Sequence, residues 1–158
     1  MKPATLGWLA LLICCHTASG QSGRPEGAPT GPNFSGDYTL IRATGDLRGI
    51  APKRLQIAQT EKVFTITETN SHGRSKSNRF PFSAEFVDDG DKGKAKAWFS
   101  WSNKLITERA INVTAGYYRQ LDTFSSLGNG NIRLCRDAFW RGEHGTESLS
   151  GCASYARR

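Results

Sequence analysis

The chain has 158 residues, of which 21 are Lys or Arg and 14 are Asp or Glu, giving a formal net charge of +7. This length suits about one domain, and a composition with 37% hydrophobic residues excludes collagen-like repeats and proteins with many membrane spans. Seventeen Gly and six Pro favour many turns and short elements over long helices.

The first twenty residues have the pattern of a secretory signal peptide. Lys2 supplies a positive charge, an uncharged apolar run follows up to Cys15, and Ala18 to Gly20 are small residues of the kind found at cleavage sites. The apolar run is much shorter than the roughly 20 residues that a membrane-spanning helix needs. We therefore expect residues 1–20 to be removed and the protein to be secreted or periplasmic, with no membrane span.

The rest of the chain divides into three parts that differ in composition and in hydrophobic pattern. Residues 21–33 are rich in Gly, Pro and Ser and nearly free of large apolar side chains, which predicts a flexible linker. Residues 34–136 form short runs of alternating apolar and polar side chains, and we expect them to make one β-barrel domain. Residues 137–158 contain scattered glycines and show no sustained period, so we expect a loop-like tail.

The alternating runs predict strands. A period of two is typical of antiparallel strands that are buried on one face. About eight such runs follow one another, mostly joined by short turns, over residues 34–40, 55–57, 64–67, 79–86, 94–101, 105–113, 117–124 and 132–136. The predicted fold is all-β, an antiparallel up-and-down meander of about eight strands, and eight strands can close into a barrel.

Cleavage of the signal peptide would leave two cysteines, Cys135 and Cys152. Two cysteines in an exported chain most simply form one disulfide, here closing a loop of about 17 residues and stabilising the fold by roughly 3 kcal/mol. We expect this bond to tie the tail back to the last strand. Two cysteines alone make a poor metal site, and we expect neither a metal nor a cofactor.

The run from Phe34 to Leu40, FSGDYTL, resembles the F-x-G-x-W-x-L opening of lipocalin-like and fatty-acid-binding-like barrels, the calycins. The stretches from Lys96 to Ile111 and from Leu121 to Arg136 are similar to small secreted bacterial lipocalin-like proteins. Those proteins have an aromatic residue, a two-residue turn and an L-x-x-E run in succession, as here from Trp101 to Glu108. The resemblance covers roughly residues 33–136. It implies a lipocalin-like barrel in which a basic residue of the last strand covers an aromatic residue of the first. Tyr38 and Arg136 match that pair, with Tyr in place of the usual Trp.

Five aromatic side chains share the expected inward parity of two neighbouring runs: Phe80, Phe82, Phe86, Phe99 and Trp101. One hypothesis takes them as walls of a cavity for an apolar ligand, as in cup-shaped binding sites. The other takes them as the filling of a small barrel without a cavity, and their bulk favours it. In the ligand hypothesis the apolar walls are Tyr38, Phe80, Phe82, Phe99 and Trp101.

Two arginines are candidates for binding an anionic group of such a ligand, Arg109 and Arg136. Arg109 shares the parity of Leu105 and Ile111, and if it faces inward its guanidinium requires an anionic partner. The alternative places Ile106 and Ala110 inside and leaves Arg109 in solvent. We favour the solvated placement because buried arginines are rare.

Other candidate sites are weaker. Basic residues within 74–79 and 92–96 surround Trp98 and would suit an anionic surface of the cell envelope, but outward charges on strands usually serve solubility. We expect no nucleic-acid partner. The run Asp88-Asp89-Gly90-Asp91 lacks the full calcium-loop pattern and predicts a hairpin turn instead. His72 and His144 lie in no catalytic motif, so an enzyme is the least favoured class.

The sequence therefore predicts an exported, non-enzymatic binding module that holds a small apolar or amphipathic ligand in a β-barrel. The alternative is a filled barrel that acts as a structural or protein-interaction module at the cell envelope through its basic outer face. The two differ in whether the barrel contains a hollow.

Overall fold

The computed structural model describes residues 30–90, 93–113, 116–142 and 145–158. The predicted signal peptide, 1–20, and residues 21–29 of the predicted linker, 21–33, lie outside these residues. The described residues form ten strands: β1 (Gly36–Gly45), β2 (Arg54–Gln59), β3 (Val63–Thr69), β4 (Ser75–Pro81), β5 (Val87–Asp88), β6 (Lys94–Phe99), β7 (Leu105–Val113), β8 (Gly116–Gly128), β9 (Asn131–Gly142) and β10 (Gly145–Arg157).

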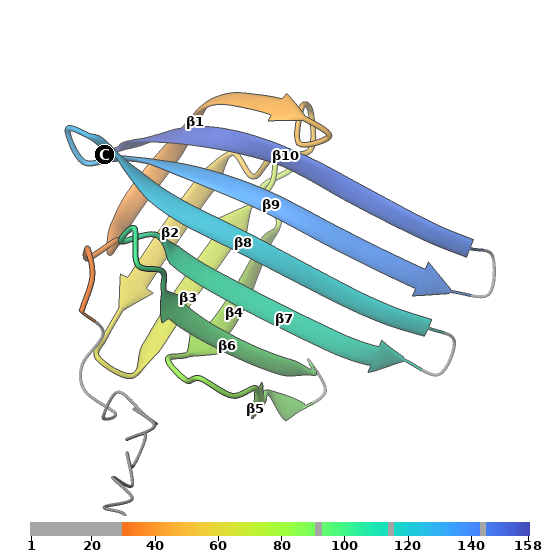
Figure 1. Cartoon of the computed structure of the whole chain (residues 1–158). Helices are drawn as coiled ribbons and strands as arrows, with labels where there is room; N and C mark the ends of the chain where they lie inside the picture. The colour runs from red at the N-terminus through yellow and green to blue at the C-terminus, as the bar shows by residue number, and fades with distance from the viewer. Residues whose placement is uncertain (1–29, 91–92, 114–115, 143–144) are drawn as a thin grey trace, which may run out of the picture.

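All ten strands belong to one antiparallel sheet, in the order β4-β3-β2-β1-β10-β9-β8-β7-β6-β5. The chain thus meanders from β1 to β4 and from β5 to β10, and the first strand pairs with the last. The sheet curls round so that Phe82, just after β4, forms a bridge to Ala97 of β6. The result is a nearly closed barrel (Figure 1), which confirms the predicted fold class with ten strands in place of eight.

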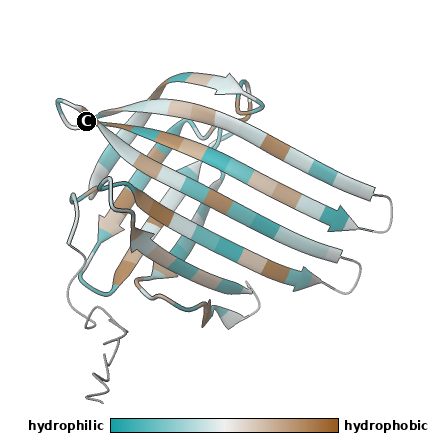
Figure 2. Ribbon diagram, in the orientation of Figure 1, coloured by the Kyte–Doolittle hydropathy of each residue, from teal (hydrophilic) through white to brown (hydrophobic). Residues whose placement is uncertain are grey.

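The alternation of buried and more exposed side chains explains why these residues form strands. On β3, Phe64 and Ile66 are buried while the threonines beside them are partly exposed. Hydrophobic and hydrophilic residues are interspersed along the long strands β7 to β10 (Figure 2). The predicted turn at 128–130 is also present, with Asn129 in the left-handed conformation that Asn tolerates.

One end of the barrel is filled, and we call it the closed end. Phe34, from the segment before β1, packs there against Phe124, with ring centroids 6.3 Å apart, and Phe124 packs against Phe64 at 5.1 Å. The side chain of Gln59 fixes this segment by accepting a hydrogen bond from the backbone N–H of Phe34. These three rings are essentially inaccessible to solvent, so no hollow remains between them.

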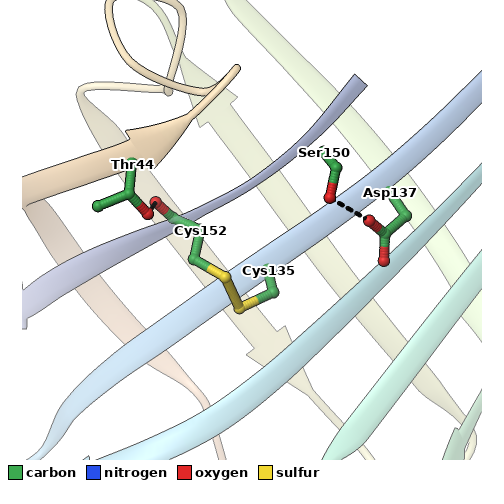
Figure 3. Close-up of a disulfide and its surroundings, with 5 residues drawn as sticks. All are labelled: Thr44, Cys135, Asp137, Ser150 and Cys152. Carbon is green, nitrogen blue, oxygen red and sulfur yellow. Dashed lines mark hydrogen bonds between the residues drawn. A yellow bond between two sulfur atoms is a disulfide. The ribbon is translucent and has the colours of Figure 1, made fainter. Parts of the chain in front are cut away.

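The prediction of a loop over residues 137–158 is wrong. β9 continues to Gly142 and β10 covers Gly145–Arg157, and the two strands pair along their whole length from Gly145 opposite Gly142 to Tyr155 opposite Ile132. Small inward residues such as Gly151 and Ala153 hide the alternation in the sequence. The predicted disulfide is confirmed, and it joins Cys135 to Cys152 directly across β9 and β10 (Figure 3).

Two glycines let the end of β1 approach β10 closely. Gly45 and Gly151 face each other in the register. A Cβ on Gly151 would lie 2.5 Å from the carbonyl oxygen of Thr44, and Gly45 adopts a φ of +62°. The chain then turns back over the opposite end of the barrel, which we call the mouth, and buries Leu47.

Candidate functional site

The mouth contains a pocket of about 380 Å³. It forms because β8, β9 and β10 run on beyond the end of β1 (Figure 1), so that no strand of the described ranges lies opposite part of their inward face. The turn after β1 contributes Leu47 and Ile50 to the pocket. The long strands contribute mainly Tyr118, Gln120, Arg136, Ala138, Trp140, Glu147 and Leu149.

The floor of the pocket is a chain of hydrogen bonds. The Tyr118 hydroxyl donates to Oε1 of Gln120 at 2.6 Å, and Nε2 of Gln120 donates to the Asp122 carboxylate at 2.8 Å. Arg136 donates to both oxygens of Asp122, at 2.8 and 2.7 Å, and also to Glu68 of β3. The chain therefore links the pocket surface to a carboxylate, Asp122, that is 1% exposed.

A second ion pair lies beside this floor. Arg109, on β7, is 4% exposed and donates to Asn78 of β4 and, at 3.1 Å, to Asp89. Its guanidinium also lies 5.1 Å from the ring centroid of Phe80. The solvated placement that the sequence favoured for Arg109 is therefore wrong. Curling of the sheet brings partners from 20 and 31 positions away, and these satisfy the buried charge.

We call the group formed by Glu68, Asn78, Asp89, Arg109, Gln120, Asp122 and Arg136 the polar belt. Burial lowers the pKa of Arg109, and the attraction of Asp89 partly offsets this. Burial also acts to lower the pKa of Arg136, but Asp122 and Glu68 raise it by more. With both guanidiniums charged and three carboxylates ionised, the belt has one negative charge in excess.

Three buried polar atoms near the belt have no hydrogen-bond partner among the described residues: Oγ1 of Thr107, Nε of Arg109 and the hydroxyl of Tyr155. Thr107 lies opposite Asp122 in the register and Arg109 lies opposite Gln120. Burial raises the pKa of Tyr155, and the nearby charge of Glu68 adds to the rise. The interior below the pocket thus has hydrogen-bonding capacity that no described residue uses.

With this geometry in view, we compared the chain with known proteins. No protein-family model matches it, and a search of curated proteins finds no relative. Within the described ranges, no cluster of three or more His, Cys, Asp or Glu side chains could hold a metal ion. The same part of the chain contains no helix of sufficient length and hydrophobicity to cross a membrane.

The predicted aromatic walls lie elsewhere. Phe80 is buried in the barrel, and Phe82 stacks on Phe99, with centroids 5.7 Å apart, where the two edges of the sheet meet. Trp101 is 98% exposed, so its predicted place in a ligand site is wrong. The alternation of inward and outward side chains along β6 does not extend to Trp101, because β6 ends at Phe99 and a tight turn follows. Phe86, also predicted to face inward, is 36% exposed.

The pairing implied for Tyr38 and Arg136 is also wrong. Tyr38 is buried, donates a hydrogen bond from its hydroxyl to the carbonyl of Phe34 at 2.8 Å, and pairs in the register with Arg157. Arg157 occupies the position predicted for Arg136 because the last strand is β10 and not the 132–136 run. Of all the predicted ligand-binding residues, Arg136 alone appears among the residues that line the mouth pocket.

Sequence reasoning missed most of the pocket. Trp140 continues the inward parity of Ile132, Leu134 and Arg136, so a signal was present, but it fell in the segment assigned to the tail. Tyr118 likewise shares the parity of Asp122. Leu47 and Ile50 have no comparable signal, because their position depends on how the turn after β1 folds.

The basic outer face is partly neutralised. Lys96 lies 3.6 Å from Glu108 and covers the rings of Phe86 and Trp98, with its amine 4.6 and 5.1 Å from their centroids. Glu108 also binds Arg119, so this carboxylate is 5% exposed although it faces outward. Lys92, which belonged to the predicted basic strip, and His144 lie outside the described residues. His72 is exposed in the turn between β3 and β4.

Proposed function

We propose that this protein is a non-enzymatic binding module that holds a small apolar or amphipathic molecule in the mouth pocket. The observation that carries the proposal is the hollow itself, about 380 Å³, with apolar walls and a polar floor. Ligand pockets typically measure about 300–1,000 Å³ and combine mostly apolar walls with a few convergent polar groups. Leu47, Trp140 and Leu149 supply such walls, and Gln120 and Arg136 supply the polar groups.

The hypothesis of a filled barrel applies to one half of the molecule. Aromatic rings fill the closed end, whereas the side chains at the mouth leave a hollow. This division suits a shallow cup that takes one small molecule. The resemblance of the opening FSGDYTL to lipocalin-like barrels supports the barrel fold that forms this cup.

We propose further that the protein is exported to an oxidising compartment. The disulfide between Cys135 and Cys152 supports this, because such bonds persist outside the reducing cytosol. The sequence pattern of residues 1–20 supports it as well.

Binding can be tested with N-phenyl-1-naphthylamine, an uncharged probe whose fluorescence rises in apolar surroundings. Ala138 lies in the pocket on the inward face of β9, and Arg133 lies exposed on the outward face of the same strand. We expect one probe molecule to bind per chain, Ala138→Phe to weaken binding at least tenfold by filling the hollow, and Arg133→Phe to leave it unchanged. Thermal unfolding would confirm that both variants are folded.

Two results would overturn the proposal. One is wild-type protein that does not bind the probe and, by native mass spectrometry after purification, has no small molecule bound. The other is an Ala138→Phe variant that binds as well as wild type. Either result would favour the filled-barrel interaction module instead.

A further inference from the structure

Three side chains form a row at the rim of the mouth pocket. Trp140 of β9 lies opposite Tyr118 of β8 on one side and opposite Glu147 of β10 on the other. Residues directly opposite each other in an antiparallel sheet have their side chains on the same face, and all three of these line the pocket. We call Tyr118, Trp140 and Glu147 the rim row. It brings two aromatic rings and a carboxylate together where the long strands extend beyond the end of β1 (Figure 1).

Glu147 carries a charge that no cation of the described residues neutralises. Among the residues that line the pocket, the charged ones are Arg136 and Glu147. Arg136 is shared by the carboxylates of Asp122 and Glu68, so two negative charges already surround its single positive one. Glu147 is exposed at the rim and takes part in none of the ion pairs between described residues. The lining and the floor together therefore present a net negative charge to a ligand.

The two rings of the rim row also favour a cation. Ammonium groups are attracted to the faces of Trp and Tyr rings, and groups of such rings bind organic ammonium ions. The side chain of Trp140 is partly open to solvent, and Gly142 leaves room for its indole, since a Cβ there would lie 2.9 Å from Nε1. The Tyr118 hydroxyl donates its proton to Gln120, so its oxygen can still accept a hydrogen bond. An ammonium group, which only donates, matches this oxygen and the Glu147 carboxylate.

An anionic head would meet the opposite conditions in the same pocket. The guanidinium of Arg136 already donates to Asp122 and Glu68, and a ligand carboxylate would have to compete with both for it. Asp46 and Arg48, in the turn after β1, carry opposite charges and lie outside the lining, so they offer no net attraction to either kind of head. The charges around the pocket thus separate cationic from anionic ligands.

We propose that the mouth pocket prefers an amphipathic ligand with an ammonium head over one with a carboxylate head, and that the rim row binds the ammonium group. This inference deepens the proposed function and rests on it, because it assumes that the pocket binds a ligand. In the complex the ammonium group lies at Glu147 and against the ring of Trp140. The apolar chain lies along Leu149 and Leu47, which line the pocket beside the rim row.

The test uses three probes with the same eight-carbon chain: octylammonium, octan-1-ol and octanoate. Each competes with N-phenyl-1-naphthylamine for the purified protein at pH 7.5, where the amine is protonated and the acid is ionised. We expect octylammonium to compete at least fivefold more strongly than octanoate, with octanol between them. Octanoate that competes as well as octylammonium would overturn the inference, while binding of the reporter would leave the proposed function standing. If the reporter does not bind, both fail.

A matched pair of variants locates the preference. Glu147→Gln removes the charge of the rim row and keeps the size of the side chain. Glu61→Gln removes the same charge from an exposed position in the turn between β2 and β3, close to Gln59 at the closed end. The readout is the ratio of octylammonium affinity to octanol affinity, which cancels any general effect of a substitution on the pocket.

We expect Glu147→Gln to lower this ratio at least threefold and Glu61→Gln to change it by less than 1.5-fold. An unchanged ratio in Glu147→Gln would overturn the assignment of the ammonium group to the rim row. Equal losses in the two variants would also overturn it, because they would show that the net charge of the whole chain, and not the rim row, sets the preference.

Discussion

Replacement of Arg136 by Met tests whether the polar belt holds the barrel together as a set of mutually dependent charges. The guanidinium donates three hydrogen bonds, two to Asp122 and one to Glu68. Methionine keeps much of the side-chain volume and donates none. Two carboxylates would then remain in the barrel, one of them 1% exposed, with no cation between them.

The expected loss of unfolding free energy is about 3–5 kcal/mol, the usual cost of removing one partner from a buried ion pair. Domains of this kind are stable by only about 5–15 kcal/mol, so the variant should be folded but easily denatured. Urea unfolding followed by tryptophan fluorescence at pH 7 measures the difference.

The control removes all three charges together, as Arg136→Met combined with Asp122→Asn and Glu68→Gln. We expect this triple variant to recover at least half of the loss, since replacing a whole buried charge network costs less than breaking it. A loss below about 1 kcal/mol in the single variant would refute the reasoning. So would a triple variant as unstable as the single one.

Three further outcomes are expected. Burial raises the pKa of Tyr155, so above pH 10 its phenol stays protonated in the folded state while it ionises in the unfolded state. Above pH 10 the free energy of unfolding should therefore fall by up to about 1.4 kcal/mol per pH unit because of this group. Tyr155→Phe should reduce this dependence of stability on pH. An unchanged slope would contradict the assignment. Replacing Cys135 and Cys152 together by Ser should lower the unfolding free energy by about 3 kcal/mol, measured by urea titration against the oxidised wild type. Trp101→Phe should remove the most acrylamide-accessible tryptophan of the described residues and change stability by less than about 0.5 kcal/mol. Undiminished quenching would show that Trp101 is covered.

The sequence predicted the strands whose alternation is sharp and whose ends have turn residues. The 64–67 run, in which Phe64 and Ile66 alternate with threonines, lies within β3, and the 105–113 run, which follows the turn residues Ser102 and Asn103, matches β7 at both ends. The prediction failed where the inward residue is small, as at Gly151 and Ala153 of β10, or where parity was extended across a turn, as at Trp101. A pattern of hydrophobicity records side-chain size and polarity, not where a strand stops.

The site was harder to predict because its contacts are not local. Arg109 faces inward only because Asn78 and Asp89 lie across the place where the two edges of the sheet meet. Arg136, predicted as an anion-binding residue, lines the mouth pocket, but its partner Glu68 comes from the other half of the barrel, 68 positions away. Neither partner follows from residue type or spacing.

The pairing of the first strand with the last also constrains how the molecule assembles. Thr44 donates a hydrogen bond to the carbonyl of Cys152, 108 positions further along the chain. During synthesis the edge of β1 therefore stays unpaired until almost the entire polypeptide has been made. Contacts between residues so far apart in the sequence also form slowly. Until then an unpaired strand edge is exposed to other chains. Correct folding should thus depend on delaying the collapse of the hairpins that are made first. Truncation near the carboxyl terminus should lead to aggregation and not to a smaller folded protein.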